Sequence, residues 1–93
     1  NIYKIEIDGG PPVQLTDSDR DYYPHWGATN DKIVFQRGGA GDIMVMNADG
    51  TDVQALVATP NNEYTPSWSP DGTKVVYCGH RWGNFDIYVY VVP

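Results

Sequence analysis

The chain carries one sequence pattern twice, and this repeat limits the folds that it can form. Residues 21–35, DYYPHWGATNDKIVF, align with residues 63–77, EYTPSWSPDGTKVVY, at a spacing of 42. An Asp-Ile dipeptide follows each copy, at Asp42-Ile43 and at Asp86-Ile87. A period of about 40 residues is typical of propeller blades and solenoid units, in which each repeat is one supersecondary unit that packs on its neighbours.

The composition favours a folded β protein and argues against two kinds of partner. The 93 residues include 3 Trp, 7 Tyr and 2 Phe, while 10 Gly and 7 Pro are in keeping with frequent turns. The formal net charge of −6 argues against nucleic acid, because such binding depends on Lys and Arg at the phosphates. The sequence also lacks an apolar stretch long enough for membrane insertion.

Short strands alternate with turn residues along the chain. Strands are expected at residues 2–7, 13–15, 23–26, 32–36, 42–46, 53–57, 65–68, 74–78 and 86–92. The turn at Pro70-Asp71-Gly72 has a physical basis, because Pro fixes φ and Gly accepts a positive φ. No window carries a helical period. The sequence therefore predicts an all-β fold, and antiparallel strands with turns about every 8–12 residues favour four-stranded propeller blades over a solenoid.

The second copy resembles the repeat of the TolB-like β-propeller family, whose blades are WD-repeat-like. The resemblance lies in residues 65–77, TPSWSPDGTKVVY, and continues through Arg81-x-Gly83-Asn84-x-Asp86-Ile87-Tyr88. Residues 42–51, DIMVMNADGT, are similar to the family's next segment, so the resemblance covers about two blades. The first copy departs from the pattern, because Gly27-Ala28-Thr29-Asn30 replaces Ser-Pro-Asp-Gly.

The resemblance implies a function as well as a fold. It implies an incomplete ring of blades within a six-bladed or larger propeller, acting as a non-enzymatic protein–protein interaction module in bacteria, periplasmic or secreted. Related propellers serve peptidases or form a carbohydrate lyase. The alternative is therefore an accessory propeller of a peptidase, hydrolase or lyase whose catalytic groups lie outside this chain. The sequence itself contains no Gly-x-Ser-x-Gly elbow and no phosphate-binding loop.

Three residues are the candidates for partner binding. His25 takes the place of a serine beside an inner-strand tryptophan, where it would face the channel. Arg81 and Trp82 lie together in a hairpin, and an exposed Trp beside Arg is a common composition of interface hot spots. The expected recognition surface is the channel mouth near His25 and the turns at 27–31 and 69–73, together with the Arg81-Trp82 hairpin.

A second set of residues is expected to be structural, because its members occupy repeated strand positions or the Pro-Asp-Gly turn of the second copy. These residues are Trp26, Trp68, Pro24, Pro66, Pro70, Asp71 and Gly72. No catalytic residue is predicted.

An acidic segment is the one candidate for a metal site. Asp17, Asp19 and Asp21 offer oxygen ligands at alternate positions, as at the start of a calcium loop. The pattern fails further on, where Tyr22 stands in place of the usual Gly and Ala28 in place of the usual Glu. We expect a solvated loop and no cofactor, with weak calcium binding as the alternative.

The repeat divides the chain into a partial blade at 1–20, a full blade at 21–60 and a partial blade at 61–93. A propeller needs about four or more blades to close, so further blades must come from the same or another chain. One solution is a segment of a longer propeller. The other is a homo-oligomer, in which three copies build a six-bladed ring. The first is favoured because the strands at 2–7 and 87–92 occupy equivalent places, and because the chain begins inside a strand pattern with no signal peptide.

Overall fold

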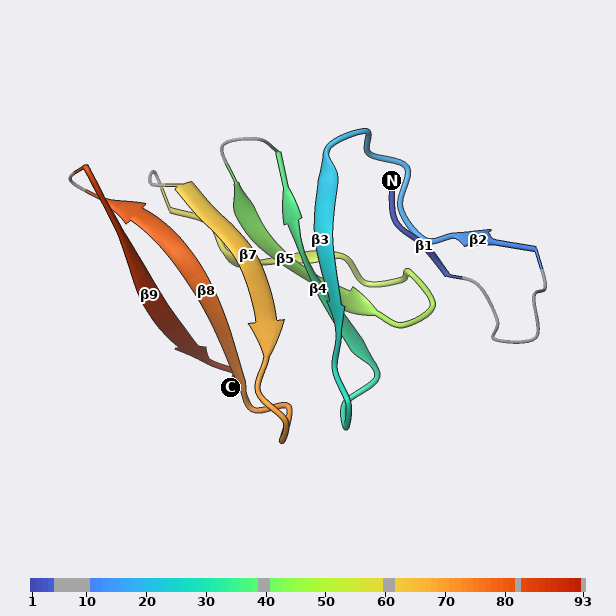
Figure 1. Cartoon of the computed structure of the whole chain (residues 1–93). Helices are drawn as coiled ribbons and strands as arrows, with labels where there is room; N and C mark the ends of the chain where they lie inside the picture. The colour runs from blue at the N-terminus through green and yellow to red at the C-terminus, as the bar shows by residue number, and fades with distance from the viewer. Residues whose placement is uncertain (5–10, 39–40, 60–61, 82, 93) are drawn as a thin grey trace.

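The computed structural model describes the chain except for residues 5–10, 39–40, 60–61, 82 and 93, and it describes Arg81 by its backbone alone. The described parts form nine strands and no helix (Figure 1). The strands are β1 (Tyr3–Lys4), β2 (Val13–Gln14), β3 (Asp21–Trp26), β4 (Lys32–Arg37), β5 (Asp42–Asn47), β6 (Gln54–Val57), β7 (Asn62–Trp68), β8 (Lys74–Arg81) and β9 (Asn84–Val91). The all-β prediction is confirmed.

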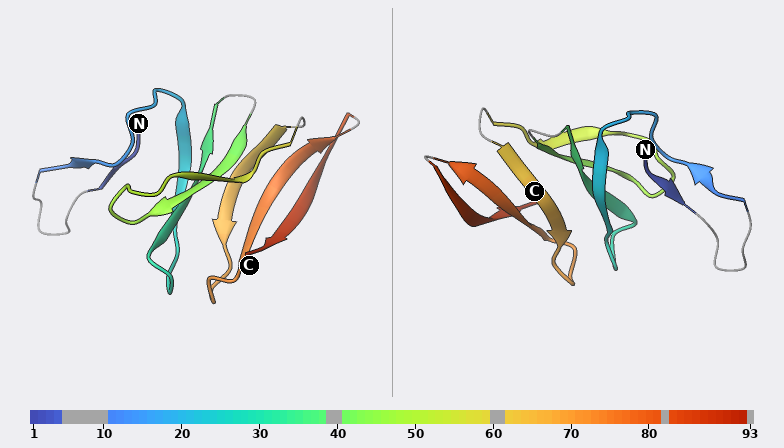
Figure 2. Two further views of the ribbon diagram at one scale, coloured as in Figure 1. Left: turned by 180° about the vertical axis from the view of Figure 1, so that it is seen from behind. Right: turned by 45° about the horizontal axis from the view of Figure 1, so that its top comes forward.

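The strands form three antiparallel sheets that follow chain order. The first sheet pairs β1 with β2, the second has the order β3-β4-β5-β6, and the third has the order β7-β8-β9. The sheets stand side by side as inclined layers, with the second between the other two (Figure 2). Each strand therefore pairs with the next one along the chain, which is the order of an antiparallel meander.

The strands β3 and β7, each the first strand of its sheet, contain a bulge at the same point of the repeat. In β3 the pairing with β4 shifts between Tyr22 and His25, and in β7 the pairing with β8 shifts between Tyr64 and Ser67. Each bulge contains a proline, Pro24 or Pro66, which lacks the N–H that a ladder bond would need. The bulge thus allows a proline within a strand that is otherwise regularly paired.

Two apolar cores fill the spaces between successive sheets. Between the first and second sheets, Ile2 packs with Ile33, Phe35 and Met46. Between the second and third sheets, the core consists of Val34, Ile43, Val57, Trp68, Val75 and Tyr77. Each sheet therefore buries apolar side chains against the next one, which is the packing that makes neighbouring blades interdependent.

Equivalent positions of the repeat differ in how far they are covered. Ile43 on β5 is 0% exposed beneath the third sheet, whereas its counterpart Ile87 on β9 is 71% exposed. Trp68 is 7% exposed, whereas its counterpart Trp26 is 47% exposed beside the small first sheet. The same residue type is thus buried or exposed according to whether a neighbouring sheet of full size lies against it.

In the described parts of the chain, no helix of the length and apolar character needed to cross a membrane is found.

Candidate recognition surface

His25 links the two larger sheets through its imidazole ring. Its Nδ1 accepts a hydrogen bond from the backbone N–H of Trp68 at 3.0 Å, and its Nε2 lies 3.5 Å from the Oγ of Ser67. A ring nitrogen that accepts must be unprotonated, so this geometry requires the proton on Nε2. His25 is nevertheless an exposed residue, so the structure places it both at a sheet-to-sheet contact and at the surface.

The expected recognition surface divides into two parts in the structure. The turns at 27–31 and 69–73 lie at one end of the sheets, and the hairpin after Arg81 lies at the other (Figure 1). On the third sheet, the turn at 69–73 and the hairpin lie at opposite ends of β8. The eight residues of β8 span roughly 23–26 Å at about 3.3 Å each. Trp82 lies outside the described residues, and the structure describes the backbone of Arg81 but not its side chain.

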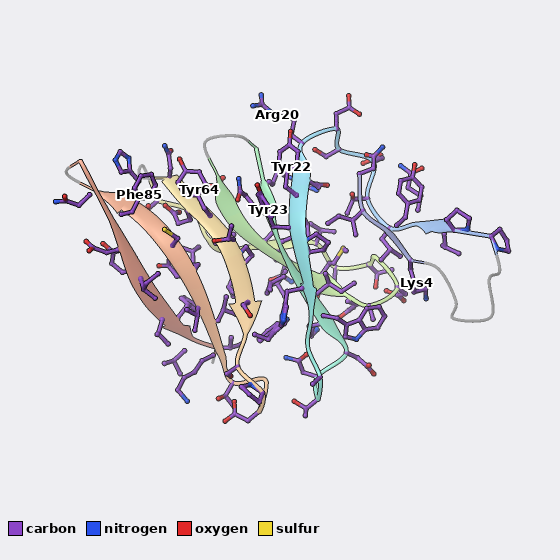
Figure 3. All side chains as sticks on the ribbon, viewed as in Figure 1. Lys4, Arg20, Tyr22, Tyr23, Tyr64 and Phe85 are labelled. Atoms are coloured by element: carbon purple, nitrogen blue, oxygen red, sulfur yellow. The ribbon has the colours of Figure 1, made fainter. Side chains whose placement is uncertain are left out.

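Aromatic side chains gather at the hairpin end of the two larger sheets (Figure 3). On β3, the rings of Tyr22 and Tyr23 lie 6.3 Å apart and are tilted by 52°. On the third sheet, the ring of Phe85 lies 6.0 Å from that of Tyr64 and 4.6 Å from that of His80. We call these five residues the aromatic end; Tyr23 and Phe85, 59% and 65% exposed, are its most accessible members.

The repeat contains a sequence signal for the aromatic end. Tyr22 and Tyr64 stand 42 positions apart, immediately before the two bulges. Their equivalence follows from the alignment of residues 21–35 with 63–77. Neither tyrosine is among the predicted site residues, because a tyrosine in a strand is most often part of a packed face.

A partly buried ion pair lies at the same end of the second sheet, with the side chain of Asp21 buried and that of Arg37 36% exposed. The carboxylate of Asp21 accepts hydrogen bonds from Arg37, with Nε–Oδ1 at 2.8 Å and Nη2–Oδ2 at 3.2 Å. Burial raises the pKa of Asp21, but hydrogen bonds from Arg37 and Thr16 and the charge of Arg37 outweigh it, so the net pKa lies below 3.8. Both oxygens of Asp21 are therefore engaged with the protein.

The other two aspartates of the acidic segment, Asp17 and Asp19, are exposed. Among the residues that the structure describes, no group of three His, Cys, Asp or Glu side chains is arranged to hold a metal ion.

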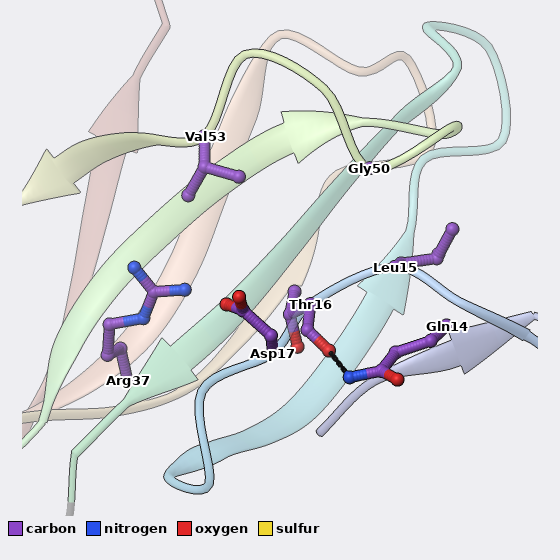
Figure 4. Close-up of a pocket in the computed structure, with 7 residues that line it drawn as sticks. All are labelled: Gln14, Leu15, Thr16, Asp17, Arg37, Gly50 and Val53. Atoms are coloured by element: carbon purple, nitrogen blue, oxygen red, sulfur yellow. Dashed lines mark hydrogen bonds between the residues drawn. The ribbon is translucent and has the colours of Figure 1, made fainter.

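Asp17 and Arg37 also line a polar pocket of about 450 Å³ between the first sheet and the turn at 49–53 (Figure 4). Gln14, Thr16 and Val53 contribute to its wall, and the amide of Gln14 donates to the carbonyl oxygen of Thr16 at 2.7 Å. Arg37 has no counterpart in the next repeat, where Gly79 takes its place, so this pocket belongs to the first copy alone.

The turn between β7 and β8 is held by its own side chains. One carboxylate oxygen of Asp71 accepts hydrogen bonds from the hydroxyls of Ser69 and Thr73, both at 2.7 Å, and from the N–H of Thr73 at 3.1 Å. These bonds lower the pKa of Asp71 to about 2. Gly72 follows with a φ of 73°, which L side chains rarely adopt. The two residues thus define the shape of the turn.

Comparisons with known proteins point to one kind of fold. No protein-family model matches the chain. The chain is 30% identical over 90 residues to an uncharacterized protein of Agrobacterium fabrum, covering 82% of this chain and 31% of that protein. It is 31% identical over 65 residues to the Tol-Pal system protein TolB of Bordetella pertussis, covering 70% of this chain and 15% of the relative.

Solved structures show the same architecture. A TolB-type protein of Agrobacterium tumefaciens superposes with a TM-score of 0.84 and 23% identity, covering 96% of this chain and 33% of the other. TolB of Acinetobacter baumannii superposes with a TM-score of 0.78 and 22% identity, and the match covers 96% of this chain and 23% of the other. The chain spans about a third or less of the length of these relatives. Its strand order, its sheet-to-sheet packing and these similarities identify the chain as a segment of a TolB-like β-propeller.

Proposed function

We propose that the chain is part of a non-enzymatic protein-interaction module and that a protein partner contacts its aromatic end. The observation that carries the proposal is the exposure of Tyr22 and Tyr23, 42% and 59%, at the hairpin end of the second sheet. Tyrosine and other aromatic residues are enriched in protein interfaces, because they bury much area for few rotatable bonds.

The similarity to Tol-Pal system proteins named TolB supports the same proposal. The proposal includes a location outside the cytoplasm, periplasmic or secreted, because the resemblance of the repeat to the TolB-like family implies it. A catalytic α/β-hydrolase pattern elsewhere in the same open reading frame would instead favour an accessory propeller of an enzyme.

Site-specific photocrosslinking in cells that make the protein tests the proposal directly. A photoreactive amino acid is placed at Tyr23, and in a matched control at Tyr3, an exposed tyrosine on β1 that lies outside the aromatic end. We expect one dominant protein adduct from position 23 and none of that mass from position 3. Equal labelling at both positions, or no adduct at position 23, would contradict the proposal.

A further inference from the structure

The hydrogen bond between Trp68 and His25 joins the second and third sheets through a side chain that titrates near neutral pH. The N–H of Trp68 on β7 donates to Nδ1 of His25 on β3 at 3.0 Å. Histidine is the side chain that ordinarily gains a proton between about pH 5 and 8. The protonated ring donates from both nitrogens and has no acceptor left. This bond therefore exists only while the ring of His25 is neutral.

Other hydrogen bonds between these two sheets use groups that do not titrate. The N–H of Thr65, in the bulge of β7 with a φ of 49°, donates to Oε1 of Gln36 at 3.2 Å. The amide of Asn30 donates to the carbonyl oxygen of Gly72 at 3.2 Å. Because amide and carbonyl groups keep the same charge across the range in which a histidine titrates, these bonds do not respond to such a change of pH.

The groups that face the ring of His25 carry no charge. From β7, the Oγ of Ser67 lies 3.5 Å from Nε2, and from β4 the paired residue is Val34. The adjoining residues of β3 are a proline and a tryptophan, and the nearby carboxylate of Asp71 is held by hydroxyls within its own turn. Among the residues that the structure describes, none forms an ion pair with this ring. His25 is exposed, so solvent protons reach it without unfolding.

The repeat shows that this point of the strand does not require a titratable side chain. Ser67 follows His25 by 42 residues and lies at the same place relative to the bulge of its strand. A serine hydroxyl also accepts hydrogen bonds, and it stays uncharged over the range in which a histidine titrates. The histidine of the first copy therefore adds a dependence on pH that a serine would not.

We propose that His25 is a pH-sensitive switch in the contact between the second and third sheets. In its neutral form the ring accepts the N–H of Trp68 and joins β3 to β7. In its protonated form the ring loses this bond, and the two sheets are held less tightly at this point. The inference concerns the packing of the sheets and does not depend on the partner proposed for the aromatic end.

Hydrogen exchange of single backbone amides, measured by NMR in the full-length ¹⁵N-labelled protein, tests the switch. We expect the protection factor of the Trp68 amide to fall about two- to tenfold between ~pH 7.5 and ~pH 5.5, as for the loss of one hydrogen bond. The amide of Ser69 is the internal control, because it donates within the third sheet to the carbonyl oxygen of Lys74 at 2.8 Å. Its protection factor should change by less than about twofold.

Two variants assign the effect to one ring. His25→Asn places an amide oxygen near the position of Nδ1, so Trp68 should stay protected at both pH values. His80→Asn is the matched control, because His80 lies against Phe85 at the aromatic end and should leave the wild-type response unchanged. The ¹⁵N shifts of the His25 ring in the wild type give a reading that needs no variant, and they should show an unprotonated Nδ1 at ~pH 7.5.

Any of four results would overturn the inference. The first is a Trp68 protection factor that does not change with pH in the wild type, and the second is an equal fall at Ser69, which would indicate opening of the whole sheet. The third is a fall that persists in His25→Asn or disappears in His80→Asn. The fourth is a proton on Nδ1 of His25 at ~pH 7.5, because a protonated nitrogen cannot accept the bond from Trp68.

Discussion

At the scale of single residues, the surrounding side chains decide which hydrogen bonds and ion pairs a repeated position forms. Asp21 and Glu63 occupy equivalent places at or near the start of β3 and β7, and both are buried. Asp21 is paired with Arg37, whereas Glu63 accepts hydrogen bonds from the N–H and hydroxyl of Thr59 at 3.2 and 3.0 Å. The repeat thus keeps a buried carboxylate and changes its donors. Only the copy with Arg37 has an ion pair at this position.

The ion pair makes a pH-dependent contribution to stability. The pKa of Asp21 is lower in the folded protein than its usual 3.8, so its contribution is present above that value and is lost as the pH falls through the folded pKa. We expect Asp21→Asn to lower the free energy of unfolding by about 1–3 kcal/mol at neutral pH, because Arg37 loses a charged acceptor. Urea unfolding at ~pH 7 and ~pH 3 should show a smaller difference from the wild type at the lower pH.

Asp19→Asn is the matched control, because Asp19 is exposed and lies two residues away. Its effect on the free energy of unfolding should stay within about 0.5 kcal/mol at either pH. If Asp21→Asn lowers the free energy of unfolding by the same amount at both pH values, the ion pair does not make the pH-dependent contribution described above.

At the scale of the strand, the sequence predicted the turns better than the bulges. The turn at 69–73 was predictable because Pro70, Asp71 and Gly72 each favour one turn conformation for a local reason. The bulges were not, because an extra residue shows itself only in pairing with a partner strand, and a positive φ before proline is uncommon. The exposure of the aromatic end was not predictable from the sequence for a related reason. Whether a side chain on a strand is exposed depends on which sheet packs against that strand.

Strand direction also accounts for the division of the expected recognition surface. In an antiparallel meander, the turn before a strand and the hairpin after it lie at opposite ends of that strand. The turn at 69–73 precedes β8 and the hairpin at 81–84 follows it. The sequence therefore contained the information needed to separate these segments, once both were assigned to the same strand.

The contact of Gln36 with the bulge in β7 carries a prediction about stability. Gln36→Met keeps a similar volume but removes the acceptor for the N–H of Thr65. A part-buried donor left without a partner should lower the free energy of unfolding by about 1–3 kcal/mol in chemical denaturation. Gln54→Met on β6, where the glutamine is exposed, is the control and should change it by no more than about 0.5 kcal/mol. Equal effects of the two substitutions would show that Gln36 does not brace the bulge.

At the scale of the whole molecule, the three sheets repeat one packing unit. The face of the second sheet that contains Val34 and Ile43 is buried by the third sheet, while the equivalent face of the third sheet exposes Val76 and Ile87. An exposed apolar face of this kind marks a surface that packs against another element. We infer that this surface is a blade-packing face of a TolB-like propeller, covered in the assembled protein by a further sheet of the same kind.

The matched substitutions Ile43→Ala and Ile87→Ala measure whether the outer face of β9 is covered, because the repeat makes the two positions equivalent. The free energy of unfolding is measured for both variants in the protein as its cells produce it. We expect both substitutions to lower the free energy of unfolding by about 2–5 kcal/mol, the usual cost of truncating a buried isoleucine. If Ile43→Ala has a large effect and Ile87→Ala changes the free energy of unfolding by no more than about 0.5 kcal/mol, the outer face of β9 remains in solvent and no further sheet covers it.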